Sequence, residues 1–86
     1  MDLGALLHHY FGTDELDGLG EAALLAGAER LAIDFGVERE PGRRFALWSL
    51  MHGLDIAPDP ATAFKTSRER EVAYTYARLA ARADKS

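Results

Sequence analysis

The apolar residues of this chain recur at the spacing of an α-helix, and no segment alternates between apolar and polar residues as a β-strand does. Leu24, Ala28, Leu31 and Phe35, for example, follow one another at intervals of four, three and four residues. The pattern predicts an all-α fold, a small single-domain bundle over residues 1–86 with four main helices and short extra helical turns. A chain of this size has room for only one domain with a thin core.

Proline and glycine mark where the main helices should begin and end. Pro41 suits the first turn of a helix, while Gly12, Gly36 and Gly53 suit helix ends because glycine readily adopts a left-handed backbone conformation. The third helix is apolar over more than half of its circumference, so we expect it to be central. The four helices are expected at about residues 3–11, 21–35, 41–53 and 67–83.

Capping residues and shorter turns complete the predicted fold. Asp2 is a candidate cap for the first helix, and Thr66 with Glu69 forms a T-x-x-E capping box before the last one. Short extra turns are expected over residues 13–17 and 60–64. The last helix is expected to turn its apolar residues inward, namely Val72, Ala73, Tyr76, Leu79, Ala80 and Ala83.

Acidic and basic residues are sorted into two halves of the chain. Residues 1–37 hold seven carboxylates and one cation, a net charge of −6, whereas residues 38–86 hold nine Lys or Arg against seven Asp or Glu, a net charge of +2. A protein polarised in this way can close its halves on each other, dimerise head to tail or dock a charged partner. All three are forms of binding, and none of them requires catalysis.

One face of the last predicted helix carries the main candidate site. Arg70, Tyr74, Arg78 and Arg82 follow at intervals of four residues and form a slowly drifting stripe, with Lys85 near the same line. Tyrosine and arginine are the residues that dominate protein interfaces, so the stripe predicts docking on an acidic protein surface. The alternative is a solvated helix face whose arginines pair with the acidic half of the chain and with the helix dipole. We expect a protein-interaction or accessory module that can also associate with itself.

Nucleic-acid binding is the leading alternative from another class of function. Arg43 and Arg44 begin the third predicted helix, and two helices joined by a turn can form a helix-turn-helix. The whole chain, however, has a net charge of −4, whereas the capture of phosphates favours a basic domain. The chain also lacks Asn and Gln, the residues that read adenine. We therefore expect no nucleic-acid partner, and a regulator of that kind would have to use Arg43, Arg44 and the stripe.

The sequence contains no motif for catalysis, a cofactor or a metal. Ser49 has no G-x-S-x-G around it, and residues 18–23 match G-x-G-x-x-A without the strand that this fingerprint requires. The acidic turn before them fits no calcium loop, because a hydrophobic residue falls where the bidentate Glu is needed. His8 and His9 point about 100° apart on a helix, so they cannot hold one metal together. A site formed by His52 and one of them would still lack a third ligand. We expect no enzyme, no cofactor and no metal.

Two further expectations concern ligands and location. A small-ligand-binding bundle with Phe45 and Trp48 near its pocket is a third candidate, although both residues suit the core. No apolar run approaches the roughly 18 residues that span a bilayer, so we expect no membrane partner and a cytoplasmic location. The abundance of Ala, Gly, Leu and Arg is typical of a bacterial protein encoded by a GC-rich genome.

Overall fold

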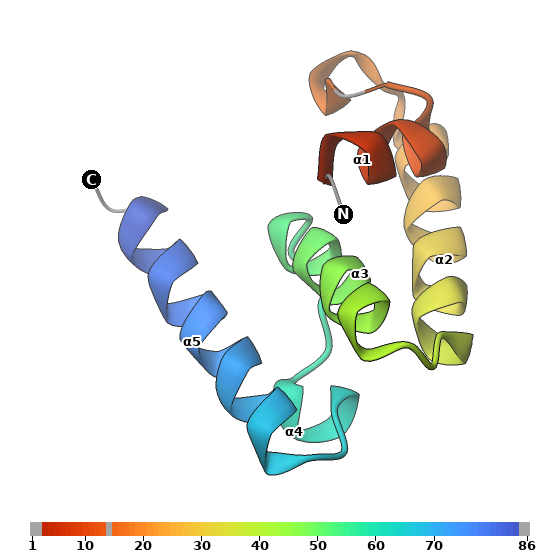
Figure 1. Ribbon diagram of the computed structural model, residues 1–86. Helices are drawn as coiled ribbons and strands as arrows, with labels where there is room; N and C mark the ends of the chain where they lie inside the picture. The colour runs from red at the N-terminus through yellow and green to blue at the C-terminus, as the bar shows by residue number, and fades with distance from the viewer. Residues whose placement is uncertain (1–2, 14, 85–86) are drawn as a thin grey trace.

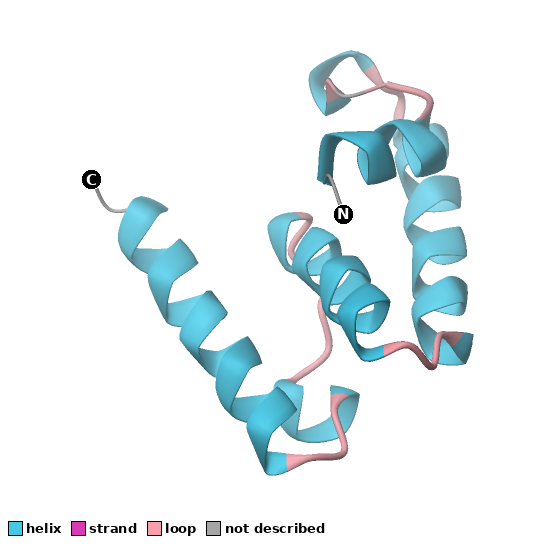
Figure 2. Ribbon diagram, viewed as in Figure 1, coloured by secondary structure: helices cyan, strands magenta, loops and turns pink. Residues whose placement is uncertain are grey.

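Every regular element in the described part of the chain is helical (Figures 1 and 2). The computed structural model describes residues 3–13 and 15–84, so the proposed cap Asp2 and the stripe neighbour Lys85 lie outside it. The prediction of a small all-α bundle with four main helices is confirmed. The elements are α1 (Leu3–Phe11), the 3-10 helix η1 (Leu16–Gly18), α2 (Glu21–Val37), α3 (Pro41–Gly53), α4 (Pro60–Ala63) and α5 (Ser67–Asp84).

Helix α3 is the centre of the molecule, as its apolar sequence predicts. It begins at Pro41. The carboxylate of the preceding residue, Glu40, caps the helix by accepting hydrogen bonds from the backbone N–H groups of Gly42 and Arg43. It packs against both α1 and α2, and five consecutive residues from 47 to 51 are buried. Trp48 is 1% exposed, and its indole N–H donates to the carbonyl of Pro58 at 2.9 Å. The rings of Phe45, His52, Phe64 and Tyr76 surround that indole.

Helix α1 lies very close to α2 because Gly27 has no side chain. A Cβ at this position would stand 2.3 Å from the Phe11 ring and 2.9 Å from the Tyr10 carbonyl oxygen. The two helices are also joined by the Tyr10 hydroxyl, which donates to Asp34 at 2.6 Å. Burial and this hydrogen bond raise the pKa of Tyr10 to about 12. These contacts between α1 and α2 hold α2 in an orientation that buries Leu31 and Phe35 in the core.

The expectation that Gly36 ends the second helix is wrong. Helix α2 continues through Gly36 to Val37, and the Glu38 N–H still donates to the Asp34 carbonyl at 3.0 Å. The physical reason lies in α3, where the Arg44 guanidinium donates to the carbonyls of Phe35 and Glu38 at 2.8 and 3.1 Å. Because these terminal acceptors are satisfied from another helix, no left-handed glycine is needed there.

Two other turns differ in detail from the prediction. Thr13 accepts a hydrogen bond from the Glu15 N–H at 3.0 Å, a local turn that delays the helical segment until η1 at 16–18. Gly53 is the last residue of α3, but the left-handed conformation falls on Asp55, with φ of 65°. Gly12 has φ of 74° and ends α1 as predicted.

Helices α4 and α5 form an arm on one side of α3. Asp59 caps α4 by accepting from the Ala61 N–H at 2.8 Å, and the Thr66 hydroxyl accepts from the Glu69 N–H at 3.1 Å, which confirms the predicted cap. Figure 1 shows α5 running along the side of the molecule opposite α2. The radius of gyration is 13.0 Å, against about 12 Å for a fully compact chain of this length. The arm therefore stands somewhat apart from the rest.

The inward face of α5 is narrower than predicted. Ala73 is fully buried, and Tyr76 reaches Phe45 and His52 of α3 at ring-centre distances of 5.7 Å. Val72 and Leu79, which were expected to face inward, are instead 47% and 59% exposed. The side chain of Ala83 lies outside the described residues. The apolar sector of α5 is thus wider than the area that α3 covers.

No helix in the described ranges 3–13 and 15–84 combines the length and the apolar character that a membrane crossing requires.

Candidate protein-interaction surface

The predicted stripe on α5 divides into two parts with different surroundings. Its first two members contact the ends of α4. The Nε–H of Arg70 donates to the Phe64 carbonyl at 2.7 Å, and the Tyr74 hydroxyl donates to Asp59 at 3.1 Å. The hydrogen bond to Asp59 raises the pKa of Tyr74. These two side chains hold α5 against α4 and are only partly available to a partner.

The last two members of the stripe are exposed and free to turn toward a partner. Arg78 makes one long contact, from its guanidinium to the Thr75 hydroxyl at 3.4 Å. Arg82 is exposed one turn further along α5. In the described part of the chain, neither guanidinium forms an ion pair with a carboxylate. Their charge is therefore not neutralised by the acidic half of the described chain.

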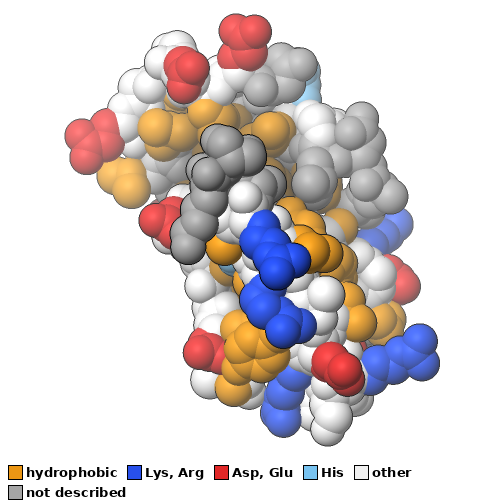
Figure 3. All heavy atoms as spheres, turned by 90° about the vertical axis from the view of Figure 1, so that its left-hand side faces the viewer, with side chains coloured by type: hydrophobic (Ala, Val, Ile, Leu, Met, Phe, Trp, Pro, Cys, Tyr) orange, Lys and Arg blue, Asp and Glu red, His pale blue; other side chains and the backbone are white. Residues whose placement is uncertain are grey.

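A second row of residues on α5 consists of exposed side chains, two of which, Val72 and Leu79, were expected to face inward. We call it the outer stripe, and its members are Arg68, Val72, Thr75, Leu79 and Arg82. They follow at intervals of four, three, four and three residues, which places them in one line along the helix. Figure 3, turned toward the side that carries α5, shows basic and hydrophobic side chains next to one another on this face. The same 3–4 spacing is visible in the sequence. The spacing does not show, however, that helix α3 covers only part of the apolar sector of α5.

The other two sequence-predicted residues, Arg43 and Arg44, have opposite environments. Arg43 is exposed at the start of α3. Arg44 is partly buried, and besides the two acceptors at the end of α2 it donates to the Ala63 carbonyl. Its guanidinium also stacks on the Phe35 ring, 4.2 Å from the ring centre. A phosphate contact through Arg44 would have to break these bonds.

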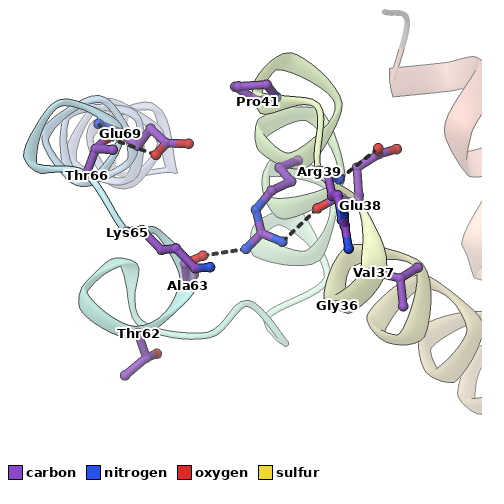
Figure 4. A pocket seen from close by; sticks show the side chains of 11 residues that line it. Gly36, Val37, Glu38, Arg39, Pro41, Thr62, Ala63, Lys65, Thr66 and Glu69 are labelled. Carbon is purple, nitrogen blue, oxygen red and sulfur yellow. Dashed lines mark hydrogen bonds between the residues drawn. The ribbon is translucent and has the colours of Figure 1, made fainter.

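Arg44 also lines the cleft shown in Figure 4. This cleft has a volume of about 810 Å³ and lies between the end of α2, the start of α3 and the α4–α5 connection. Arg39, Lys65, Glu38 and Glu69 contribute charges of both signs to its walls. Because the most enclosed cation, Arg44, already binds three carbonyls, the cleft offers no ready site for an anion.

The ligand-binding hypothesis placed Trp48 beside a pocket, but its ring is packed in the core. An apolar pocket of about 500 Å³ does lie elsewhere, between η1, α2 and the segment after α3. Its walls include Leu16, Leu24 and Ile56, with Asp17 as the charged lining residue, and Trp48 is not among them.

The remaining polar residues considered for chemistry have structural contacts. The buried Ser49 hydroxyl donates to the Phe45 carbonyl at 2.8 Å, and His52 packs between the rings of Trp48 and Tyr76. No group of three or more His, Asp or Glu side chains in the described ranges is placed to hold a metal ion.

Comparisons with protein-family models, with curated proteins and with solved structures found no match for this chain.

Proposed function

We propose that this protein is an interaction module that docks on an acidic surface of another protein through the outer side of α5. Arg78 and Arg82 supply the positive charge. Leu79, which lies between them in the chain, and Val72, two turns earlier on the outer stripe, supply the apolar contact. The observation that carries the proposal is the exposed outer stripe, in which Val72 and Leu79 lie between Arg68 and Arg82. Arg78 stands next to Leu79, and neither Arg78 nor Arg82 has a carboxylate partner in the described chain. Arg70 and Tyr74 act mainly by fixing α5 on α4.

The composition of this face favours a protein partner over a nucleic acid. Leu79 is 59% exposed at the centre of the basic part of α5, and a phosphate backbone offers it no apolar surface. An interface between proteins, in contrast, has an apolar centre surrounded by polar and charged residues. A partner with an apolar depression bordered by Asp and Glu would match both features.

A nuclease-treated pull-down with mass spectrometry tests the proposal. Wild type is compared with the double variant Arg78→Glu/Arg82→Glu and with the matched control Arg39→Glu/Lys65→Glu, which makes the same charge change on exposed residues outside α5. The proposal expects an acidic protein that wild type and control retain and that the α5 variant loses. Helicity and melting temperature should be unchanged, because these are exposed positions.

A direct titration of the captured protein then separates docking from general charge attraction. Leu79→Ala should weaken binding by about tenfold, and added salt should weaken it further. If Leu79→Ala has no effect, or if the control variant loses the partner as well, the contact is not the one proposed.

A further inference from the structure

Helix α2 is apolar on two opposite sides, although only one of them faces the core. Gly27, Leu31 and Phe35 are buried, as expected. Ile33 projects from the opposite side, with Leu25 and Val37 to either side of it around the helix, and Leu25, Ile33 and Val37 are 64%, 58% and 72% exposed. A surface helix normally carries polar residues on its solvent side, and a helix that is apolar all round is normally buried. This side of α2 therefore lacks a partner in the described chain.

The exposed side of α2 is mostly apolar, with one acidic and one basic residue among its side chains. We call it the outer face of α2, and its members are Ala22, Leu25, Ala26, Glu29, Arg30, Ile33 and Val37, with Glu29 and Arg30 at the middle of its length. Small residues alternate with large ones, so a second helix can approach closely and fill the spaces between the large side chains. Glu29 and Arg30 stand at the middle of α2 and have no hydrogen-bond or ion-pair partner in the described residues.

We propose that two copies of the chain associate through the outer face of α2, with the two helices antiparallel. A twofold axis between Glu29 and Arg30 brings Glu29 of each copy opposite Arg30 of the other copy. The dimer would therefore contain two equivalent ion pairs. The same register places Ala26 opposite Ile33 and Ala22 opposite Val37, a small residue against a large one each time. A parallel arrangement would set Glu29 against Glu29, and like charges in an interface are unfavourable.

A second copy fits this face better than an unrelated protein because the face is complementary to itself. A twofold interface uses the same patch on both subunits, and this patch carries one acidic and one basic residue at its centre. The chain is also small, so dimerisation adds apolar burial to a thin core. In Figure 1, α2 and α5 lie on opposite sides of α3, so the dimer leaves both α5 helices open. The dimer does not depend on the function proposed for α5.

The expected dimer is reversible. Helix α2 has 17 residues and is about 25 Å long, and one pair of such helices buries less than the roughly 800 Å² per partner of a standard interface. The dissociation constant should therefore be on the order of micromolar, and the monomer should be folded.

Analytical ultracentrifugation of the full chain, from about 1 µM to about 1 mM, tests the proposal. Wild type should change from monomer to dimer within this range. Ile33→Glu should raise the dissociation constant more than about tenfold because it places a charge in the apolar contact. The matched control, Leu79→Glu, makes the same change on an equally exposed residue of α5 and should leave the dimer intact.

Charge exchange tests the antiparallel register. Glu29→Arg alone and Arg30→Glu alone should each weaken the dimer, and the double variant should restore it to near wild type. Both positions are exposed, so circular dichroism should be unchanged in all three.

Three results would overturn the proposal: a wild type that stays monomeric at about 1 mM, a dimer that Leu79→Glu disrupts but Ile33→Glu does not, or a double variant that fails to recover. None of these results bears on the docking partner of α5, which is tested separately.

Discussion

Replacing Gly27 by alanine tests how closely α1 and α2 approach. In most helices this change is stabilising, by about 1 kcal/mol, because alanine has the higher helix propensity. Here the new Cβ would stand 2.3 Å from a Phe11 ring carbon and 2.9 Å from the Tyr10 carbonyl oxygen. The ring can rotate, but the carbonyl belongs to the backbone of α1, so the whole helix must shift.

The expected magnitude follows from these two opposing effects. Overpacking a closely packed contact costs about 1–3 kcal/mol, and the gain in propensity offsets about 1 kcal/mol of that. Gly27→Ala should therefore lower the free energy of unfolding by up to about 2 kcal/mol. Gly36 lies in the same helix with nothing within 4 Å of its would-be Cβ, so Gly36→Ala should instead raise the free energy by up to about 1 kcal/mol.

Urea titrations followed by Trp48 fluorescence measure both changes, at a protein concentration low enough to keep the chain monomeric. The two variants should differ by about 2 kcal/mol, which corresponds to about 10 °C in melting temperature for a domain of this size. A Gly27→Ala protein that is as stable as the Gly36→Ala protein would refute the close approach of α1 to α2.

Two further predictions concern Tyr10 and Arg44. The folded state keeps the Tyr10 proton up to about pH 12, whereas the unfolded chain releases it near pH 10, so this stabilisation is complete below pH 10 and is lost between pH 10 and 12. Over that range the free energy of unfolding of wild type should fall by about 2 kcal/mol more than that of Tyr10→Phe, as measured by urea titrations at several pH values. If the free energy of unfolding falls equally with pH in both proteins, the hydrogen bond to Asp34 is contradicted. Arg44→Met should cost about 2–4 kcal/mol in thermal or urea unfolding, because it leaves three carbonyls without their donor and removes a cation from the Phe35 ring. Arg43→Met, its exposed neighbour, should cost less than about 0.5 kcal/mol, and similar losses for the two would show that Arg44 has no special role.

The parts of the fold that the sequence predicts are those decided within a few residues. The start of α3 at Pro41 and the cap formed by Thr66 and Glu69 depend on local bonds, so their residue types are sufficient signals. The end of α2 depends on Arg44, nine residues beyond Phe35 in the chain, and no local pattern could predict that.

The candidate site could be predicted only as a helix face, for the same reason. Periodicity places Arg70 and Arg82 on one drifting stripe, but it does not say which turn of α5 meets α4. The contact of Arg70 with the Phe64 carbonyl comes from the angle at which α5 leaves α4, a tertiary property. The helical stripe through Leu31 contains only three of the six large apolar residues of α2, and its spacing does not say that the other three stay exposed.

The attachment of α5 has a consequence for the thermodynamics of docking. Arg70 and Tyr74 fix the first turns of the helix to α4, and the indole of Trp48 fixes the segment that leads to α4. A partner would therefore meet a binding element that is already ordered and would have to immobilise only side chains, at roughly 0.5–1.5 kcal/mol each. Segments that fold on binding lose much more conformational entropy, and their helicity rises when the complex forms. Binding through α5 should leave the helical circular dichroism of this protein almost unchanged.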